Sequence, residues 1–298
     1  MLPRKEIASK NAYGSLVRPP SSSRESQQMV RKRRDITETD VQNWVKKGFG
    51  QGEGDAYSPW AKVRDVPSLG RSTRIAALRH KRIHNTYSDV ETGHLLQTDF
   101  ALGVIEIREQ FALLPREETV EIAEELGLRH PTYPGTRVPI VMTSDLFVLR
   151  GEPSGGPFVL SVKRDEALHP GMKGLPRTLE KLQIEKRYWD CRNIPWRLVT
   201  QSHFDPVQVR NLALLRPSGK AWRSAEGQSR AADVAQRVAS AKWRMRPLRA
   251  LIESSGWGAQ AMFEALGHAA WRRWLPLDMS CPLSMDCPLP LLGVRDAV

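Results

Sequence analysis

The chain has 298 residues, of which 40% are hydrophobic and 26% charged, so it can bury a core, and this composition excludes a wholly disordered protein. Its 45 Lys and Arg residues against 33 Asp and Glu residues give a net charge of +12, which favours polyanionic partners such as nucleic acids but does not require them. No apolar run reaches the ~20 residues of a membrane span. Three cysteines, Cys191, Cys281 and Cys287, are too few and too unevenly spaced for a zinc site or a disulfide framework, so we expect free thiols in a reducing cytoplasm.

Residues 1–36 contain Pro19-Pro20, a serine run and the cluster Arg31-Lys32-Arg33-Arg34, with little to bury. We expect a flexible basic tail, which either orders on a phosphate backbone or has no role. Residues 47–72 are rich in Gly, Pro and Ser and predict a long ordered loop. Their glycine run lacks the Gly-Lys-Ser/Thr ending of a phosphate-binding loop.

The stretch from residue 74 to 86 is basic and shows no sustained helical period. His80 and His84 lie four residues apart, a spacing that suits a metal on a helix, but the missing period favours a basic edge that faces phosphates. A solvated hairpin edge is the alternative. The residues that we expect to contact DNA phosphates are Arg71, Arg74, Arg79, Lys81 and Arg82.

The following residues predict alternating helices and strands. Ser88 begins the first helix, Gly127 closes the second, and Thr178 or a neighbour caps the third. The expected helices are 88–99, 117–126 and 177–191, and the expected strands are 102–108, 140–149, 158–163 and 194–200. Their order predicts an α/β layer with a mixed sheet.

Beyond about residue 204 the strand signal fades. Helical patterns at 206–215, 229–245 and 258–273, with interleaved Trp and basic residues, predict a second, smaller, mostly helical domain. The last twenty residues, rich in Pro and Leu, form either a tail or a docking segment. The expected organisation is therefore a tail at 1–36, a first domain at 37–203 and a C-terminal domain at 204–298.

Asp145 lies inside an apolar strand, where burial of a carboxylate costs several kcal/mol unless it is paired or binds a metal. Lys163 ends the next apolar strand, and a hairpin would bring the two side chains together. An acid and a lysine on neighbouring strands are typical of the PD-(D/E)xK nuclease fold, in which the acids bind Mg²⁺ and the lysine orients or activates water. On these two residues alone a simple ion pair is the favoured explanation, because an acid followed by a lysine on a hairpin is common.

Two further acids have alternative interpretations. Glu91 stands three residues after Ser88, so it forms either a capping box or another metal-binding acid. Glu185 lies on the helix after the lysine strand, either on a charged face with Glu180 and Lys181 or near the metal.

Several motifs in residues 40–200 together carry a resemblance. In chain order they are Gly48-x-Gly50-Gln51-Gly52-x-Gly54-x-x-Tyr57-x-Pro59-Trp60, Val66-Pro67-Ser68-x-Gly70-Arg71-Ser72, Ser88-Asp89-x-Glu91, Ile107-Arg108-Glu109-Gln110-Phe111-x-Leu113-Leu114-Pro115, Thr143-Ser144-Asp145, Val162-Lys163 and Thr178-Leu179-Glu180-Lys181-Leu182-x-x-Glu185-x-Arg187-Tyr188-Trp189. Through them the chain resembles the TnsA-like endonuclease subunits of heteromeric transposases of the Tn-seven type. The C-terminal third matches that family only weakly.

The resemblance implies a site. Its catalytic residues would be Glu91, Asp145 and Lys163, and Mg²⁺ or Mn²⁺ would be bound by Glu91, Asp145 and the Val162 carbonyl. Ser161 occupies the position that is an acid in most nucleases of this fold, which puts the affinity for metal in doubt more than the reaction type. Ser161 and Glu185 are therefore candidates for supporting roles only.

The resemblance also implies a fold and a task. The fold would be a restriction-endonuclease-like domain followed by a winged-helix domain. The task would be nicking the 5′ side of transposon ends in the bacterial cytoplasm, with a TnsB-like transposase that acts on the 3′ ends and a TnsC-like ATPase regulator that contacts the C-terminal part; no membrane is involved. Two alternatives stay open at this point: a stand-alone repair or restriction nuclease, and a DNA-binding protein without catalysis.

Overall fold

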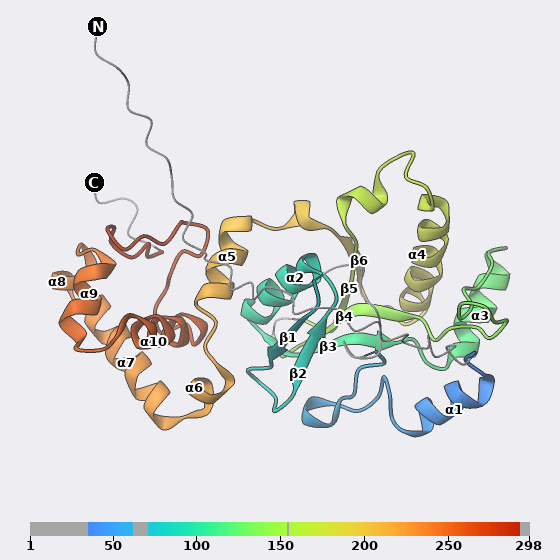
Figure 1. The fold of residues 1–298 in the computed structure, drawn as a ribbon, viewed down its shortest axis with the longest axis horizontal. Helices are drawn as coiled ribbons and strands as arrows, with labels where there is room; N and C mark the ends of the chain where they lie inside the picture. Colours follow the sequence, from blue (N-terminus) through green and yellow to red (C-terminus); the bar gives the residue numbers. More distant parts are fainter. Residues whose placement is uncertain (1–34, 62–70, 154, 293–298) are drawn as a thin grey trace, which may run out of the picture. The chain divides into compact units, whose positions relative to one another are not determined.

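The computed structural model describes residues 35–61, 71–153 and 155–292 (Figure 1). The predicted basic tail, with its cluster of arginines, lies almost wholly outside these residues, as do residues 66–70 of the second motif. Within the described ranges no helix is both long enough and apolar enough to cross a membrane.

A four-stranded sheet lies at the centre of the first part of the chain. Its strands, in spatial order, are β3 (Val104–Ala112), β4 (Thr143–Arg150), β5 (Phe158–Val162) and β6 (Trp196–Val199). β3 and β5 both pair antiparallel with β4, whereas β6 runs parallel to β5, so the mixed sheet and the expected hairpin are confirmed. β3 extends past the predicted end at residue 108, because its polar residues also pair with β4.

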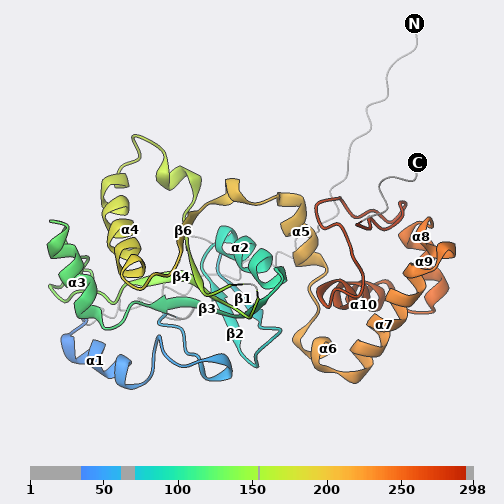
Figure 2. The same ribbon diagram turned by 180° about the vertical axis from the view of Figure 1, so that it is seen from behind.

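Helices cover both faces of this sheet (Figure 2). They are α2 (Asp89–Phe100), α3 (Arg116–Glu125) and α4 (Leu175–Asp190). Successive strand residues point to opposite faces. Leu146 and Val148 therefore pack with Leu95 of α2, whereas Phe147 packs with Ile184 of α4 on the other face.

The predicted helices of this part are confirmed to within a residue or two, but one cap is wrong. Helix α4 begins after Gly174, which adopts a left-handed conformation with φ of 94° and makes no side-chain cap. Pro176 stands in the first turn instead, where its missing N–H costs nothing. Thr178 is therefore already inside the helix rather than its cap.

Before α2 lie a helix that was not predicted and a hairpin that was expected only as an alternative. They are α1 (Glu38–Lys46) and the antiparallel strands β1 (Thr73–Ala76) and β2 (Ile83–Thr86). The buried residues of β2 are His84, Asn85 and Thr86, so this strand lacks the alternation of apolar and polar residues that marks a strand in a sequence. Its polar side chains find partners only in the folded protein.

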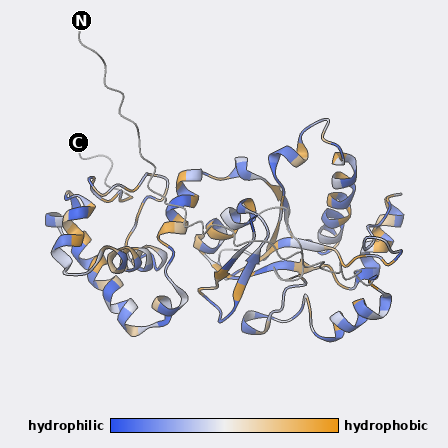
Figure 3. Cartoon of the chain, in the orientation of Figure 1, coloured by the Kyte–Doolittle hydropathy of each residue, from blue (hydrophilic) through white to orange (hydrophobic). Residues whose placement is uncertain are grey.

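The residues after Asp205 form helices around a core that also includes Leu78 and Leu96 from the preceding part of the chain. These are α5 (Pro206–Leu214), α6 (Gly219–Arg223), α7 (Ala225–Ala239), α8 (Ala241–Arg244), α9 (Leu248–Ser255) and α10 (Ala259–Trp271). The predicted helix 229–245 is interrupted at Ser240, where α7 ends and α8 begins. Hydrophobic and hydrophilic bands alternate along these helices, as expected when one face is buried (Figure 3). Among the described residues after 204, pairing of extended segments is limited to isolated bridges.

The described part of the C-terminal segment packs onto these helices. Leu277, Met279 and Leu291 are buried in the same core as α7 and α10. The segment is therefore docked on its own chain as far as residue 292, and of the two alternatives for it the docking segment fits better.

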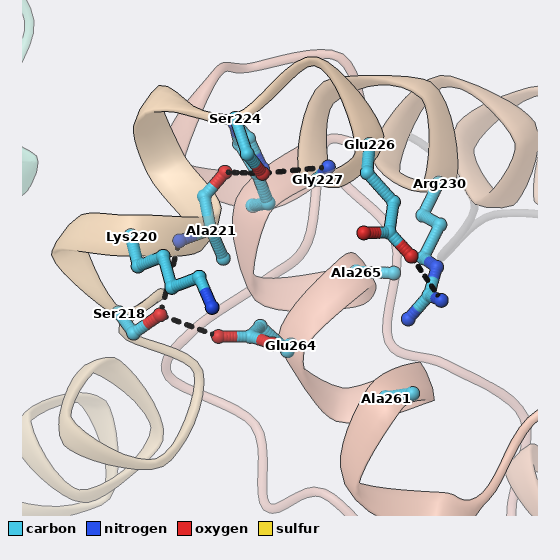
Figure 4. A pocket seen from close by; sticks show the side chains of 11 residues that line it. Ser218, Lys220, Ala221, Ser224, Glu226, Gly227, Arg230, Ala261, Glu264 and Ala265 are labelled. Carbon is cyan, nitrogen blue, oxygen red and sulfur yellow. Dashed lines mark hydrogen bonds and ion pairs between the residues drawn. The ribbon is translucent and has the colours of Figure 1, made fainter.

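A small pocket lies where α6 and α7 begin (Figure 4). Ser218 donates a hydrogen bond to Glu264 over 2.7 Å, and Ser224 accepts the Gly227 amide as the cap of α7. Glu226 and Arg230 form an ion pair one turn along α7. These polar groups therefore bond to one another at the edge of the pocket.

Replacing Gly267 by alanine should destabilise this helical part. An added Cβ on Gly267 of α10 would lie 1.9 Å from the Leu215 carbonyl oxygen, a backbone atom that cannot easily yield. We expect the free energy of unfolding to fall by about 1–3 kcal/mol, as in other overpacked cores. Urea unfolding would measure this loss, with Gly156→Ala as the control because a Cβ there meets nothing within 4 Å. Equal stability of both variants would contradict the close packing of α10.

Candidate active site

Asp145 lies on β4 at the point where the backbone pairing of β4 with β5 stops. Its Oδ2 accepts the Val162 amide over 2.6 Å and the Lys163 ammonium over 3.3 Å. Lys163 also donates to the Val162 carbonyl over 2.8 Å. Where the backbone pairing ends, hydrogen bonds of the Asp145 side chain thus hold the end of β5 beside β4. The predicted proximity of Asp145 and Lys163 is what the structure shows.

Glu91 lies in the first turn of α2. Ser88 caps the helix through the Glu91 amide over 3.1 Å, and the Glu91 carboxylate accepts the Ser88 hydroxyl and the Tyr87 amide. Burial, and next the charge of Asp145, raise the pKa of Glu91 to about 7. Ser88 therefore caps the helix, but the Glu91 carboxylate binds the Tyr87 amide instead of the Ser88 amide, so the reciprocal bond of the expected capping box is not formed. The charge of Asp145 acts on this carboxylate, as expected if both belong to one site.

The charge of Lys163 balances these acids. Burial alone would lower the pKa of Lys163, but the nearby carboxylates, Asp145 first and then Glu185 and Glu91, outweigh burial and raise it. Lys163 thus stays protonated at neutral pH. The structure brings Glu91, Asp145 and Lys163 into one electrostatic cluster, although they come from α2, β4 and the end of β5.

Glu185 points into the protein rather than lying on a charged helix face, because its carboxylate finds partners inside. It accepts hydrogen bonds from Ser144 over 2.7 Å and from Ser161 over 3.0 Å, and it is only 5% exposed. Burial, and next the charge of Asp145, raise the pKa of Glu185. The hydroxyl of Ser161 is therefore already engaged in a hydrogen bond with Glu185. The interpretation of Glu185 as a surface charge is wrong.

Gln110 of β3 is a neighbour of Asp145 that the sequence reasoning missed. Its Nε2 donates to Asp145 Oδ1 over 3.4 Å. It lies inside the quoted motif Arg108-Glu109-Gln110, and a polar run in the middle of a strand was the one available signal.

The residues predicted to grip DNA fall into two groups. Arg71, Arg74 and Lys81 are exposed, so phosphate contact stays a prediction for them. Arg82 instead pairs with Glu109 over 2.7 Å, and its side chain is only 7% exposed. The prediction for Arg82 is wrong, because a buried acid claims the guanidinium. Arg79 is also exposed, although it forms an ion pair with the buried Asp99, and phosphate contact stays a prediction for it as well.

The oxygen atoms around Asp145 suit a hard divalent cation. Two carboxylates, Glu91 and Asp145, and the Val162 carbonyl are the ligand types that Mg²⁺ and Mn²⁺ prefer. The charge of Asp145 raises the cost of ionising Glu91, which a bound cation would relieve. Among the described residues no group of three or more His, Cys, Asp and Glu side chains forms a candidate metal site. The remaining ligands would therefore be backbone oxygen, water or phosphate.

A mixed sheet that places an acid and a lysine at the end of a β-hairpin, with a second acid from the first turn of α2, is consistent with an endonuclease-like fold. The family model described as TnsA-like endonuclease N terminal matches residues 103–201, which include Asp145, Lys163 and Glu185. The transposition protein TnsA of transposon Tn7 from Escherichia coli is 37% identical over 187 residues, which cover 63% of this chain and 66% of that relative. The chain is therefore similar to TnsA-like endonuclease subunits, and residues 103–201 match their N-terminal domain. It aligns with slightly less than two thirds of its relative.

Proposed function

We propose that this protein is a metal-dependent DNA endonuclease with a PD-(D/E)xK core. The observation that carries the proposal is the cluster in which Asp145 binds the Val162 amide and Lys163 while Glu91 faces it. The similarity to a transposition protein supports DNA as the substrate, and the net charge of +12 suits a polyanion. Catalysis is favoured over a purely structural ion pair, because one partly buried lysine near three carboxylates leaves more negative charge than a simple pair would need.

The proposed task is nicking the 5′ side of transposon ends as the TnsA-like subunit of a heteromeric transposase. A TnsB-like transposase would process the 3′ ends. A TnsC-like ATPase regulator would contact the helical domain 204–298, for which we propose a winged-helix-like fold. The site of action would be DNA in the bacterial cytoplasm. Residues 37–203 would form the catalytic domain.

The residues of this chain divide the work. When bound by Glu91, Asp145 and the Val162 carbonyl, Mg²⁺ or Mn²⁺ would neutralise charge at the scissile phosphate and lower the pKa of an attacking water. Lys163 orients that water and adds positive charge beside the phosphate. The Val162 amide fixes the Asp145 carboxylate, and Glu185 keeps Ser161 and Ser144 in place beneath the site.

A nicking assay tests this function. The protein, with its TnsB-like partner, is incubated with end-labelled duplexes that carry the transposon ends, in Mg²⁺, Mn²⁺ or EDTA. We expect nicks at the 5′ side with either metal and none in EDTA. Absence of cleavage with both metals would overturn the proposal, and sequence-specific cleavage without the partner would favour a stand-alone nuclease.

The exposed basic residues of the β1–β2 hairpin should hold phosphates. Arg74 and Lys81 are both exposed. We expect the double variant Arg74→Ala, Lys81→Ala to bind DNA more weakly than the wild type, with about the same loss of affinity for transposon-end and for random duplexes. Each lost phosphate contact should reduce the slope of log affinity against log salt by about one unit. The matched control is Lys186→Ala, Arg187→Ala, which removes two exposed charges from α4. A loss confined to transposon-end DNA, or no loss, would refute the phosphate contacts.

A further inference from the structure

Gln110 has an unusual backbone conformation at the level of Asp145. The β3–β4 register pairs Glu109 with Leu146 and Phe111 with Ser144, which places Gln110 opposite Asp145. Gln110 has a φ of 48°, in the left-handed region of backbone conformation that residues other than glycine rarely adopt. Such conformations persist only where the surroundings impose them, and they gather at functional sites.

Contacts from outside the sheet hold Gln110 in this conformation. The Trp60 amide donates to the Gln110 carbonyl over 3.2 Å, and the Tyr57 hydroxyl donates to the Glu109 carbonyl over 2.9 Å. Upstream of both, Gly50 lies so close to β3 that an added Cβ would be 2.3 Å from the Cβ of Ala112. The glycine-rich motif thus supports the outer edge of β3, and its Trp60 fixes the direction of the Gln110 peptide.

The side chain of Gln110 is aimed at the catalytic carboxylate. Its Nε2 donates to Asp145 Oδ1, and a carboxylate, which only accepts, selects this end of the amide; the Thr143 hydroxyl donates to the other end, Oε1, over 3.3 Å. The other oxygen of Asp145 is already engaged by the Val162 amide and Lys163. Asp145 is therefore held through Oδ2 from β5 and through Oδ1 from β3.

We propose that Gln110 is a positioning residue that orients the Asp145 carboxylate toward the metal, and that its left-handed backbone is what carries the amide there. This inference rests on the proposed function of the site. It makes a specific prediction, because glycine adopts the same backbone conformation freely while lacking the amide. A purely structural Gln110 would be replaceable by glycine without loss.

The test compares Gln110→Gly with Asn193→Gly. Asn193 is a matched control, since it also has a left-handed φ, 53°, but stands in the turn after α4. Three quantities are measured for each variant: the Tm of the metal-free protein, the Kd for Mn²⁺ by calorimetry, and the rate of strand cleavage with the TnsB-like partner.

For Gln110→Gly we expect a Tm at or above that of the wild type, a Kd for Mn²⁺ raised about 10–100-fold and a cleavage rate reduced to a similar extent, as for other residues that orient metal ligands. Asn193→Gly should keep the wild-type Kd and rate. A wild-type Kd and rate in Gln110→Gly, or a clear drop in its Tm, would overturn the inference. If the wild type binds Mn²⁺ but cleaves nothing, the proposed function fails, and the Mn²⁺ comparison still decides the role of Gln110.

Discussion

The variant Asp145→Ala is expected to lose strand cleavage, with a rate at least ~10³-fold below that of the wild type, because a lost metal ligand commonly costs several kcal/mol at the transition state. The same change also removes the acceptor of the Val162 amide and the partner of Lys163. The measurement is nicking of labelled transposon-end duplex with the TnsB-like partner present. Association with that partner should be largely unchanged.

Two further variants make this result specific. Asp145→Asn keeps the shape and one oxygen that can accept the Val162 amide, so it separates the lost charge from a disturbed hairpin. Asp190→Ala removes an exposed acid that pairs with Lys186 on α4 and should cleave normally. Near-normal nicking by Asp145→Ala would refute the enzymatic role of the whole cluster.

The second large effect is expected for Glu109, whose side chain is 1% exposed. Its carboxylate accepts hydrogen bonds from Arg82, from His84 over 2.8 Å and from the Asn85 amide over 3.1 Å. Glu109→Gln leaves the charge of the buried Arg82 uncompensated, and breaking a buried pair in this way costs about 3–5 kcal/mol. Urea unfolding at pH 7 would measure the loss.

The pH dependence of the same carboxylate gives an independent check. Burial alone would raise the pKa of Glu109, but the hydrogen bond and charge of His84 and the charge of Arg82 lower it below the ordinary value of 4.5. The folded protein therefore holds this proton less tightly than the unfolded chain. The stabilisation is fully present above pH 4.5 and is lost as the pH falls below it. The gap in stability between the wild type and Glu109→Gln should narrow in that range.

An exposed ion pair provides the control for Glu109. Glu118 pairs with Arg192, and its side chain is 38% exposed, so Glu118→Gln should cost less than about 1 kcal/mol. If Glu109→Gln lowered the free energy of unfolding equally little, the contacts of Glu109 with Arg82, His84 and Asn85 would not be what joins the β1–β2 hairpin to β3.

The sequence by itself determined the elements whose signal is local. The α2 helix begins at Ser88 as predicted, and the apolar runs around Asp145 and before Lys163 pair as a hairpin, because period and composition are properties of neighbouring residues. From these two runs the proximity of Asp145 and Lys163 could be predicted. The short polar strand β2 could not, since its buried residues carry no apolar pattern.

Only the tertiary structure decided which charged and polar side chains face inward. Arg82 and Glu109 lie 27 residues apart in the chain, and nothing local indicates that each is the other's partner. Glu185 turns toward Ser144 and Ser161 on two separate strands, and Gln110 reaches Asp145 because Trp60 holds its backbone from outside the sheet. A sequence shows that a residue is charged, but its role depends on partners that the folded chain brings together, since burial of a charge is stable only when it is paired.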